Sequence, residues 1–138
     1  MDKIAVVGGA GRVGESAALY LMQQSLCREV AVIDIAEGPA KGAALDIAES
    51  APVFGSDVRV WGSADYADLA GSDLIVVTAG LPRKPGMSRS DLLDKNIAIM
   101  DQIADAAVAH APDAMMIVVA NPVDVMTYRD QPVRCQAR

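Results

Sequence analysis

The sequence has 138 residues and a formal net charge of −6 at pH 7. This length suits a single domain, and 52% hydrophobic with 22% charged residues is the composition of a folded chain rather than a disordered one. The acidic balance argues against nucleic acid as a partner, because general binding to phosphate backbones needs a basic face. No apolar run reaches the roughly 18 residues of a membrane-spanning helix, and the sequence starts without a signal-peptide pattern. We therefore expect no membrane partner and a cytoplasmic location.

The cysteine and histidine content limits the chemistry further. Cys27 and Cys135 lie far apart, and neither belongs to a CxxC or Cys/His metal spacing, so we interpret them as reduced thiols. His110 is the single histidine, so the sequence lacks the residues for a multi-histidine zinc mechanism and has almost nothing from which to build a Ser-His-Asp mechanism. We expect no metal site. His110 comes at the predicted end of a long helix, where a histidine favours the last-turn carbonyls and the helix dipole.

Along the chain, short apolar runs alternate with segments whose apolar residues recur every three to four positions, which predicts alternating strands and helices. In chain order these are strand Lys3–Gly8, helix Arg12–Ser25, strand Glu29–Ile35, helix Pro39–Ser50 (ending before Pro52), strand Val58–Trp61, helical turn Asp65–Ala70, strand Asp73–Thr78, helix Ser90–Ala109 and strand Met115–Ala120. This alternation predicts an α/β, doubly wound parallel sheet with right-handed crossovers. We expect five strands in the order 3-2-1-4-5, the fifth being an exposed edge.

The long predicted helix Ser90–Ala109 is apolar on two sides. One stripe contains Leu93, Ile97, Met100, Ala104 and Ala107, and the other contains Leu92, Ile99, Ile103 and Ala106. Such a helix lies deep in a core or meets another subunit. Both alternatives stay open here and for the Ala44–Ser50 part of the preceding helix.

A glycine-rich turn joins the first predicted strand to the first predicted helix. Gly9, Ala10, Gly11, Arg12, Val13 and Gly14 match the pattern G-x-G-x-x-G. In a dinucleotide-binding (Rossmann) turn, the glycines permit the tight turn, the approach of a pyrophosphate and close helix–strand packing. Asp34 follows Gly14 by 20 residues at the second strand's end, where a carboxylate binds the adenosine ribose and repels a 2′-phosphate. We therefore expect NAD; a turn without ligand and a methyltransferase are the alternatives.

The segment from Leu74 to Ser90 holds no acidic residue, yet it contains Arg83, Lys84 and Arg89. It follows the carboxyl end of the fourth predicted strand, where ligands of open α/β sheets bind. A short cationic loop bent by Gly and Pro is interpreted as a lid for a small anion. Arginine suits a carboxylate because its planar fork makes two charge-assisted hydrogen bonds. A solvated surface loop is the alternative.

Four segments together resemble the malate dehydrogenases, most closely their lactate-dehydrogenase-like bacterial branch. They are the glycine-rich turn, Ala44-Leu45-Asp46-Ile47, residues 77–89 (VTAGLPRKPGMSR) and Asn121-Pro122-Val123-Asp124. The resemblance covers residues 3–128. It implies reversible hydride transfer between NADH and oxaloacetate or malate, a step of the tricarboxylic acid cycle, by a homo-oligomeric enzyme.

The resemblance also implies a role for each matching residue. On the cofactor side the residues are Gly9–Gly14, Asp34, Asn96, Val119, Ala120 and Asn121. On the substrate side, Arg83 selects a second carboxylate, Arg89 polarises the reacting oxygen, and Asn121 contacts that oxygen. Asn-Pro after a strand is otherwise a common turn initiator.

The family's proton donor is a histidine paired with an aspartate in a second domain, and this sequence stops before such a pair. We expect residues 1–128 to form the NAD-binding domain, truncated before strand six and the catalytic domain, and residues 129–138 to form an irregular tail. Pro132 breaks any helix there, and the tail has no hydrophobic period. A frameshifted or artificially ended tail is left open. So is an inactive NAD-binding fragment as the alternative to an enzyme.

Overall fold

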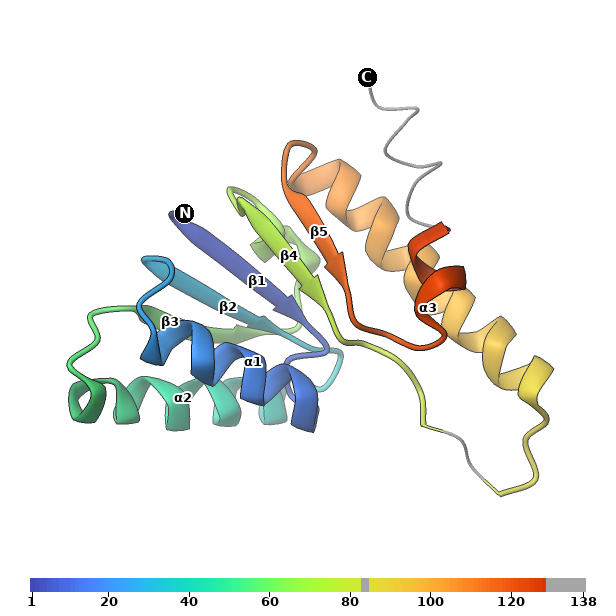
Figure 1. Cartoon of the computed structure of the whole chain (residues 1–138), viewed down its shortest axis with the longest axis horizontal. Coiled ribbons are helices and arrows are strands. Elements are labelled where there is room, and N and C mark those ends of the chain that lie inside the picture. Colours follow the sequence, from blue (N-terminus) through green and yellow to red (C-terminus); the bar gives the residue numbers. More distant parts are fainter. Residues whose placement is uncertain (83–84, 129–138) are drawn as a thin grey trace.

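A computed structural model of the chain describes residues 1–82 and 85–128. The elements are β1 (Lys3–Val7), α1 (Arg12–Gln23), β2 (Glu29–Ile33), α2 (Glu37–Phe54), β3 (Arg59–Ser63), the 3-10 helix η1 (Tyr66–Leu69), β4 (Leu74–Val77), α3 (Arg89–His110) and β5 (Met115–Val118). Residues 123–128 are also helical. Five parallel strands form one sheet in the order β3-β2-β1-β4-β5, so the predicted fold class and strand order are confirmed (Figure 1).

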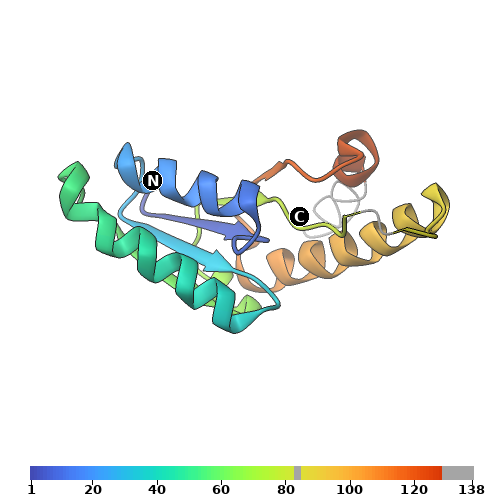
Figure 2. The ribbon, with the colours of Figure 1, turned by 90° about the horizontal axis from the view of Figure 1, so that it is seen from below.

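Side chains of successive residues in the central strands point to opposite faces of the sheet. In β1, Ile4 and Val6 pack with α1 and α2, whereas Ala5 and Val7 pack with α3. The buried clusters thus place α1 and α2 on one face of the sheet and α3 on the other, and Figure 2 shows α1 and α3 on opposite sides of the strands. Because both faces are covered, the strands are nearly continuous apolar runs, as parallel strands generally are.

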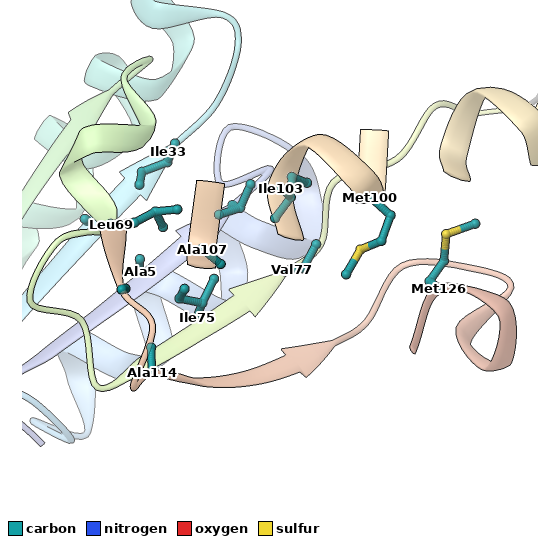
Figure 3. Close-up of a cluster of buried hydrophobic side chains, with 13 residues drawn as sticks. Ala5, Ile33, Leu69, Ile75, Val77, Met100, Ile103, Ala107, Ala114 and Met126 are labelled. Atoms are coloured by element: carbon teal, nitrogen blue, oxygen red, sulfur yellow. The ribbon is translucent and has the colours of Figure 1, made fainter. Parts of the chain in front are cut away.

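The core on the α3 side extends from the sheet to the helical residues 123–128. Met100, Ile103 and Ala107 of α3 are buried in it, and Met126 joins the same cluster beside Met100 (Figure 3). Leu93, Ile97, Ile99 and Ala106 are partly buried against it. The apolar sides of α3 therefore belong to the core of this chain over most of the helix length.

The bounds of α2 correct the sequence prediction. The helix covers Glu37–Phe54, not Pro39–Ser50, and Pro52 lies inside it. It continues because Ala51 is buried against the core beneath α1 and α2, and a proline in the last turn removes few backbone hydrogen bonds. Gly55, with φ 65°, ends the helix. The other predicted bounds differ from the observed ones by at most two residues.

β5 is an edge strand, as predicted, and one of its faces is also open. Met116 and Val118 pack toward α3, whereas Met115 and Ile117 point to the opposite face and are 56% and 51% exposed. Figure 1 places α1 and α2 over the other end of the sheet. The described part of the chain thus leaves an apolar strip on this face of β5.

At the opposite edge of the sheet, Trp61 of β3 makes two cation–aromatic contacts. The Lys3 ammonium lies 5.0 Å from the centroid of its ring and the Arg59 guanidinium 5.1 Å from it. Lys3 Nζ also donates to the carbonyls of Asp68 (2.6 Å) and Ala70 (2.9 Å), tying η1 to β1. Burial lowers the pKa of Lys3, against the opposing pull of nearby carboxylates.

Cys27 is a free, buried thiol two residues before β2, and burial raises its pKa, which disfavours the reactive thiolate. Cys135 lies outside the described residues. His110 is the last residue of α3, the position predicted for it.

Candidate cofactor-binding site

The glycine-rich turn is tied to the end of β2 through its backbone. The N–H groups of Gly8 and Gly9 donate to the carbonyl of Ile33 at 2.8 and 3.1 Å, and Gly11 N–H donates back to Gly8 O at 3.1 Å. Gly8 has φ 81°, a conformation that other residues rarely adopt. The turn therefore lies directly beside the residue that follows β2, which is Asp34.

Gly14 lets the first turn of α1 press against this loop. A Cβ at Gly14 would lie 2.7 Å from Gly9 Cα and 2.8 Å from Thr78 Oγ1, both closer than real Cβ atoms approach. The third glycine of the pattern thus provides close packing, as the sequence predicts.

The start of α1 offers backbone N–H groups without a side-chain cap. Its N-cap is Gly11, and no side chain accepts a hydrogen bond there. By contrast, α3 begins with a full capping box between Ser88 and Asp91. Uncapped N–H groups at a helix start carry partial positive charge and suit a phosphate.

Asp34 is held at the carboxyl end of β2 by two backbone donors. Its Oδ2 accepts from Ala10 N–H at 3.2 Å, and its Oδ1 accepts from Ala36 N–H at 3.1 Å. The side chain is half-buried and lines the cavity next to the glycine turn. Glycine turn and carboxylate are thus brought together as predicted.

A cavity of about 270 Å³ lies at this carboxyl edge of the sheet. Gly8, Gly11 and Asp34 form one part of its wall. Further along the wall are Ile35, Tyr66, Ile99 and Gln102, none of which the sequence pattern singles out. Burial raises the pKa of Tyr66, with a further contribution from Asp34, so the hydroxyl stays protonated beside that carboxylate.

The loop after β4 is joined to α3 by a buried side chain. Asn96 Oδ1 accepts a hydrogen bond from Leu81 N–H at 2.8 Å. Leu81 also lines the cavity, so Asn96 borders the cavity through its backbone partner. The cofactor contact that the resemblance implies for Asn96 stays a prediction.

The implied substrate residues are only partly placed. Arg83 lies outside the described residues. Arg89 is the exposed first residue of α3, and Asn121 is exposed three residues after β5, next to a cis bond with Pro122. Neither Arg89 nor Asn121 is among the described residues that line the cavity.

The end of β5 also carries two of the implied cofactor residues. Val119 N–H donates to Val77 O at 2.9 Å, which continues the pairing with β4 past Val118. Ala120 is half-buried against the α3-side core. Their predicted backbone contacts with a cofactor stay predictions.

Across residues 1–82 and 85–128, no three His, Cys, Asp or Glu side chains are grouped to hold a metal ion. In the same part of the chain, no helix is both long and apolar enough to cross a bilayer.

A parallel sheet of this order, with a glycine turn at its first crossover and an acid after its second strand, defines a dinucleotide-binding domain. More specifically, the chain belongs to the family of the lactate/malate dehydrogenase NAD-binding domain, whose model matches residues 2–132. This membership removes the methyltransferase alternative.

Individual relatives of the chain are malate dehydrogenases. The chain is 59% identical over 129 residues to a malate dehydrogenase of Thioalkalivibrio sulfidiphilus, covering 94% of this chain and 42% of that protein. It is 55% identical over 128 residues to one of Nitrosococcus oceani, covering 93% and 41%. The chain thus spans about two-fifths of the length of these relatives.

Solved structures agree with the fold. The apo malate dehydrogenase of Picrophilus torridus superposes with a TM-score of 0.91 at 44% identity, covering 97% of this chain and 42% of that one. The malate dehydrogenase of Archaeoglobus fulgidus, solved in complex with NADH, gives 0.90 at 46% identity, covering 95% and 44%. NAD is accordingly the cofactor of this domain type.

Proposed function

We propose that the cavity at the carboxyl edge of the sheet is the seat of NAD, and that the protein containing this domain is an NAD-dependent malate dehydrogenase. The cofactor accepts or supplies a hydride when bound. The observation that carries the proposal is the uncapped amino end of α1, which opens at a cavity walled by Gly8, Gly11 and Asp34.

The residues of the cavity fit successive parts of an adenine dinucleotide. The turn Gly9–Gly14 cradles the pyrophosphate, and the donors are the uncapped N–H groups at the start of α1, because the N–H groups of Gly9, Ala10 and Gly11 already donate within the protein. Asp34 binds the adenosine ribose. Its carboxylate repels a 2′-phosphate, which favours NAD over NADP. Ile35, Tyr66 and Ile99 provide the apolar wall for the base.

On the substrate side we assign Arg83, Arg89 and Asn121. Oxaloacetate is a dianion, and two guanidinium groups offset the cost of removing it from water. Reduction of its ketone builds negative charge on oxygen, which Arg89 and the Asn121 amide stabilise in a site from which water is excluded. Asn96, Val119 and Ala120 complete the cofactor side. A substrate without the second carboxylate leaves Arg83 unpaired, and this supplies discrimination.

The second candidate is an NAD-binding module without turnover. It is favoured by the residues present, because the only histidine, His110, ends α3 and is exposed. We assign the reaction to the longer protein and expect the 138-residue chain alone to bind NADH without consuming it.

Two measurements on the purified chain test these assignments. Calorimetry with NADH is expected to give saturable binding with one site per chain, and correctly folded material that binds neither NADH nor NAD contradicts the proposal. Oxaloacetate-dependent oxidation of NADH is expected to equal the buffer rate; rapid turnover would overturn the assignment of the chain alone as a module. Reading the nucleotide sequence beyond codon 128 in all frames tests whether a longer catalytic protein is encoded.

We further propose that the protein acts in the cytoplasm, within the tricarboxylic acid cycle, as a homo-oligomer. The candidate contact surface in α2 is the outer face of its Ala44–Ser50 part, where Leu45 is 58% exposed. An open groove of about 480 Å³ between α1 and α2, with Arg12 and Asp46 on its walls, adjoins that face. Sedimentation of the longer protein tests this assembly.

A further inference from the structure

Thr78, the residue that follows β4, is bonded to the first strand in two ways. Its backbone N–H donates to Val7 O at 2.8 Å, which continues the pairing of β4 with β1. Its hydroxyl Oγ1 lies 3.1 Å from Val7 O and 3.1 Å from Gly8 O. A hydroxyl has one proton, so these two carbonyls share it. The side chain thus reaches across 70 residues of sequence to the start of the glycine turn.

The carbonyl of Gly8 is a central acceptor of that turn. It accepts from Gly11 N–H at 3.1 Å as well as from the Thr78 hydroxyl. Gly8 itself has φ 81° and lies so close to the backbone of Ala79 that a Cβ would be 2.6 Å from Ala79 Cα. The orientation of the peptide group after Gly8 is therefore determined by Thr78 on one side and by Gly11 on the other.

The same hydroxyl also lies against the first turn of α1. A Cβ at Gly14 would come within 2.8 Å of Thr78 Oγ1, so the hydroxyl occupies the space that the missing side chain leaves. The end of β4, the glycine turn and the start of α1 consequently meet at one half-buried oxygen atom. No residue of the G-x-G-x-x-G pattern provides this contact.

We propose that Thr78 is a positioning residue for the cofactor's pyrophosphate. By holding Gly8 O, its hydroxyl keeps the uncapped N–H groups at the start of α1, those of Arg12 and Val13 among them, aligned toward the cavity. This inference rests on the proposed NAD site. Thr78 lines the cavity, but the inference assigns its hydroxyl no hydrogen bond to the cofactor, since the hydroxyl proton is used by the two carbonyls.

The test separates pyrophosphate alignment from general stability. Thr78→Val keeps the branched shape and the backbone N–H but removes the hydroxyl, and Thr78→Ser keeps the hydroxyl. Calorimetry measures each variant of the chain with NADH, with ADP and with adenosine, which lacks phosphate. The other threonine, Thr127, is exposed in the helical residues 123–128, and Thr127→Val serves as the matched control.

For Thr78→Val we expect affinity for NADH and ADP to fall by about tenfold, as the loss of one well-placed hydrogen bond would give, while affinity for adenosine stays within twofold. Thr78→Ser is expected to restore both phosphate ligands to within about threefold of wild type. Equal losses for all three ligands, or an unchanged affinity for ADP, would overturn the inference. A wild-type chain that binds none of them contradicts the proposed function and this inference together, whereas wild-type binding with an unaffected Thr78→Val variant contradicts the inference alone.

Discussion

The Asn96 carbonyl oxygen accepts a hydrogen bond at 2.8 Å from the Leu81 backbone N–H, which fastens the loop after β4 to the amino-terminal half of α3. Asn96 is buried within α3, whereas Leu81 is exposed. The loop that contains Arg83 therefore starts from a fixed point on α3.

Replacing Asn96 by Leu should remove the hydrogen bond that attaches the loop to α3 at Leu81. We expect a loss of about 0.5–1.5 kcal/mol in the free energy of unfolding, the usual net value of one such hydrogen bond. Amide exchange at Leu81 should accelerate, which NMR measures directly. The only other asparagine, Asn121, is exposed, and Asn121→Leu should leave exchange at Leu81 unchanged. Undisturbed protection of Leu81 in Asn96→Leu would show that the bond does not hold the loop.

Two helical glycines provide a matched pair. Gly14→Ala places a Cβ 2.7 Å from Gly9 Cα, whereas a Cβ added at Gly42 in α2 would have no atom within 4 Å. Gly14→Ala should displace the turn and weaken NADH binding at least tenfold. Gly42→Ala should keep wild-type affinity and add up to about 1 kcal/mol of stability, since Ala is the better helix former. Calorimetry and guanidine unfolding check both, and normal NADH affinity in Gly14→Ala would contradict the packing argument.

Asp34→Asn tests discrimination between the two nicotinamide cofactors. The amide keeps one oxygen acceptor but removes the charge that repels a 2′-phosphate. We expect NAD affinity to fall and NADP affinity to rise, so that the ratio of the two dissociation constants changes by about tenfold or more. Asp46→Asn removes an exposed carboxylate of α2 and should leave the ratio as it is. A ratio that Asp34→Asn does not change excludes the ribose role.

The pH dependence of stability should include a contribution from Asp73. Its Oδ2 accepts from the backbone N–H groups of Asp2 and Lys3, at 2.5 and 3.2 Å, and these bonds lower its pKa in the folded chain. Because the folded pKa is below the unfolded one, the contribution is present above the unfolded pKa and is lost as the pH falls through the folded value. In Asp73→Asn, the loss of unfolding free energy between neutral and acidic pH should be smaller. Urea unfolding across this pH range measures it, with Asp57→Asn as the control for net charge; an identical pH profile in Asp73→Asn would refute the assignment.

The open face of β5 predicts self-association. Ile117 is 51% exposed, and Ile117→Lys places a charge in the middle of the apolar strip. Light scattering should decrease at high protein concentration, while the guanidine midpoint changes little because the side chain is already half in water. Scattering that is equal in wild type and Ile117→Lys would show that this strip is not the contact.

Most of the fold follows from local pattern. The apolar runs and the spacing of Gly9–Gly14 and Asp34 predict the sheet order and the turn, because they reflect burial on two faces and a single tight crossover. The predicted end of α2 is wrong because burial of Ala51 outweighs the backbone hydrogen bond that Pro52 removes.

The cavity wall is harder to predict. Tyr66 and Gln102 reach it from η1 and α3, and only the packing of those elements against the sheet brings them beside Asp34. No periodicity in the sequence predicts that Tyr66 and Gln102 line the cavity beside Asp34. Ile35 has a local signal, because it directly follows Asp34 beyond the strand end. The hydrogen bond from the Thr78 hydroxyl to Gly8 O likewise joins residues that are distant in sequence, so no local pattern predicts it.

Trp61 is the sole indole of the chain, and its contacts with Lys3 and Arg59 make it an intrinsic optical probe of one border of the sheet. Its emission is sensitive to both cations and to the docking of β3 beside β2. Denaturation followed at this fluorophore reports the border remote from β5, whereas far-ultraviolet dichroism averages over all helices and strands. A fluorescence transition that precedes the dichroism transition would reveal that this border detaches before the remainder of the molecule melts.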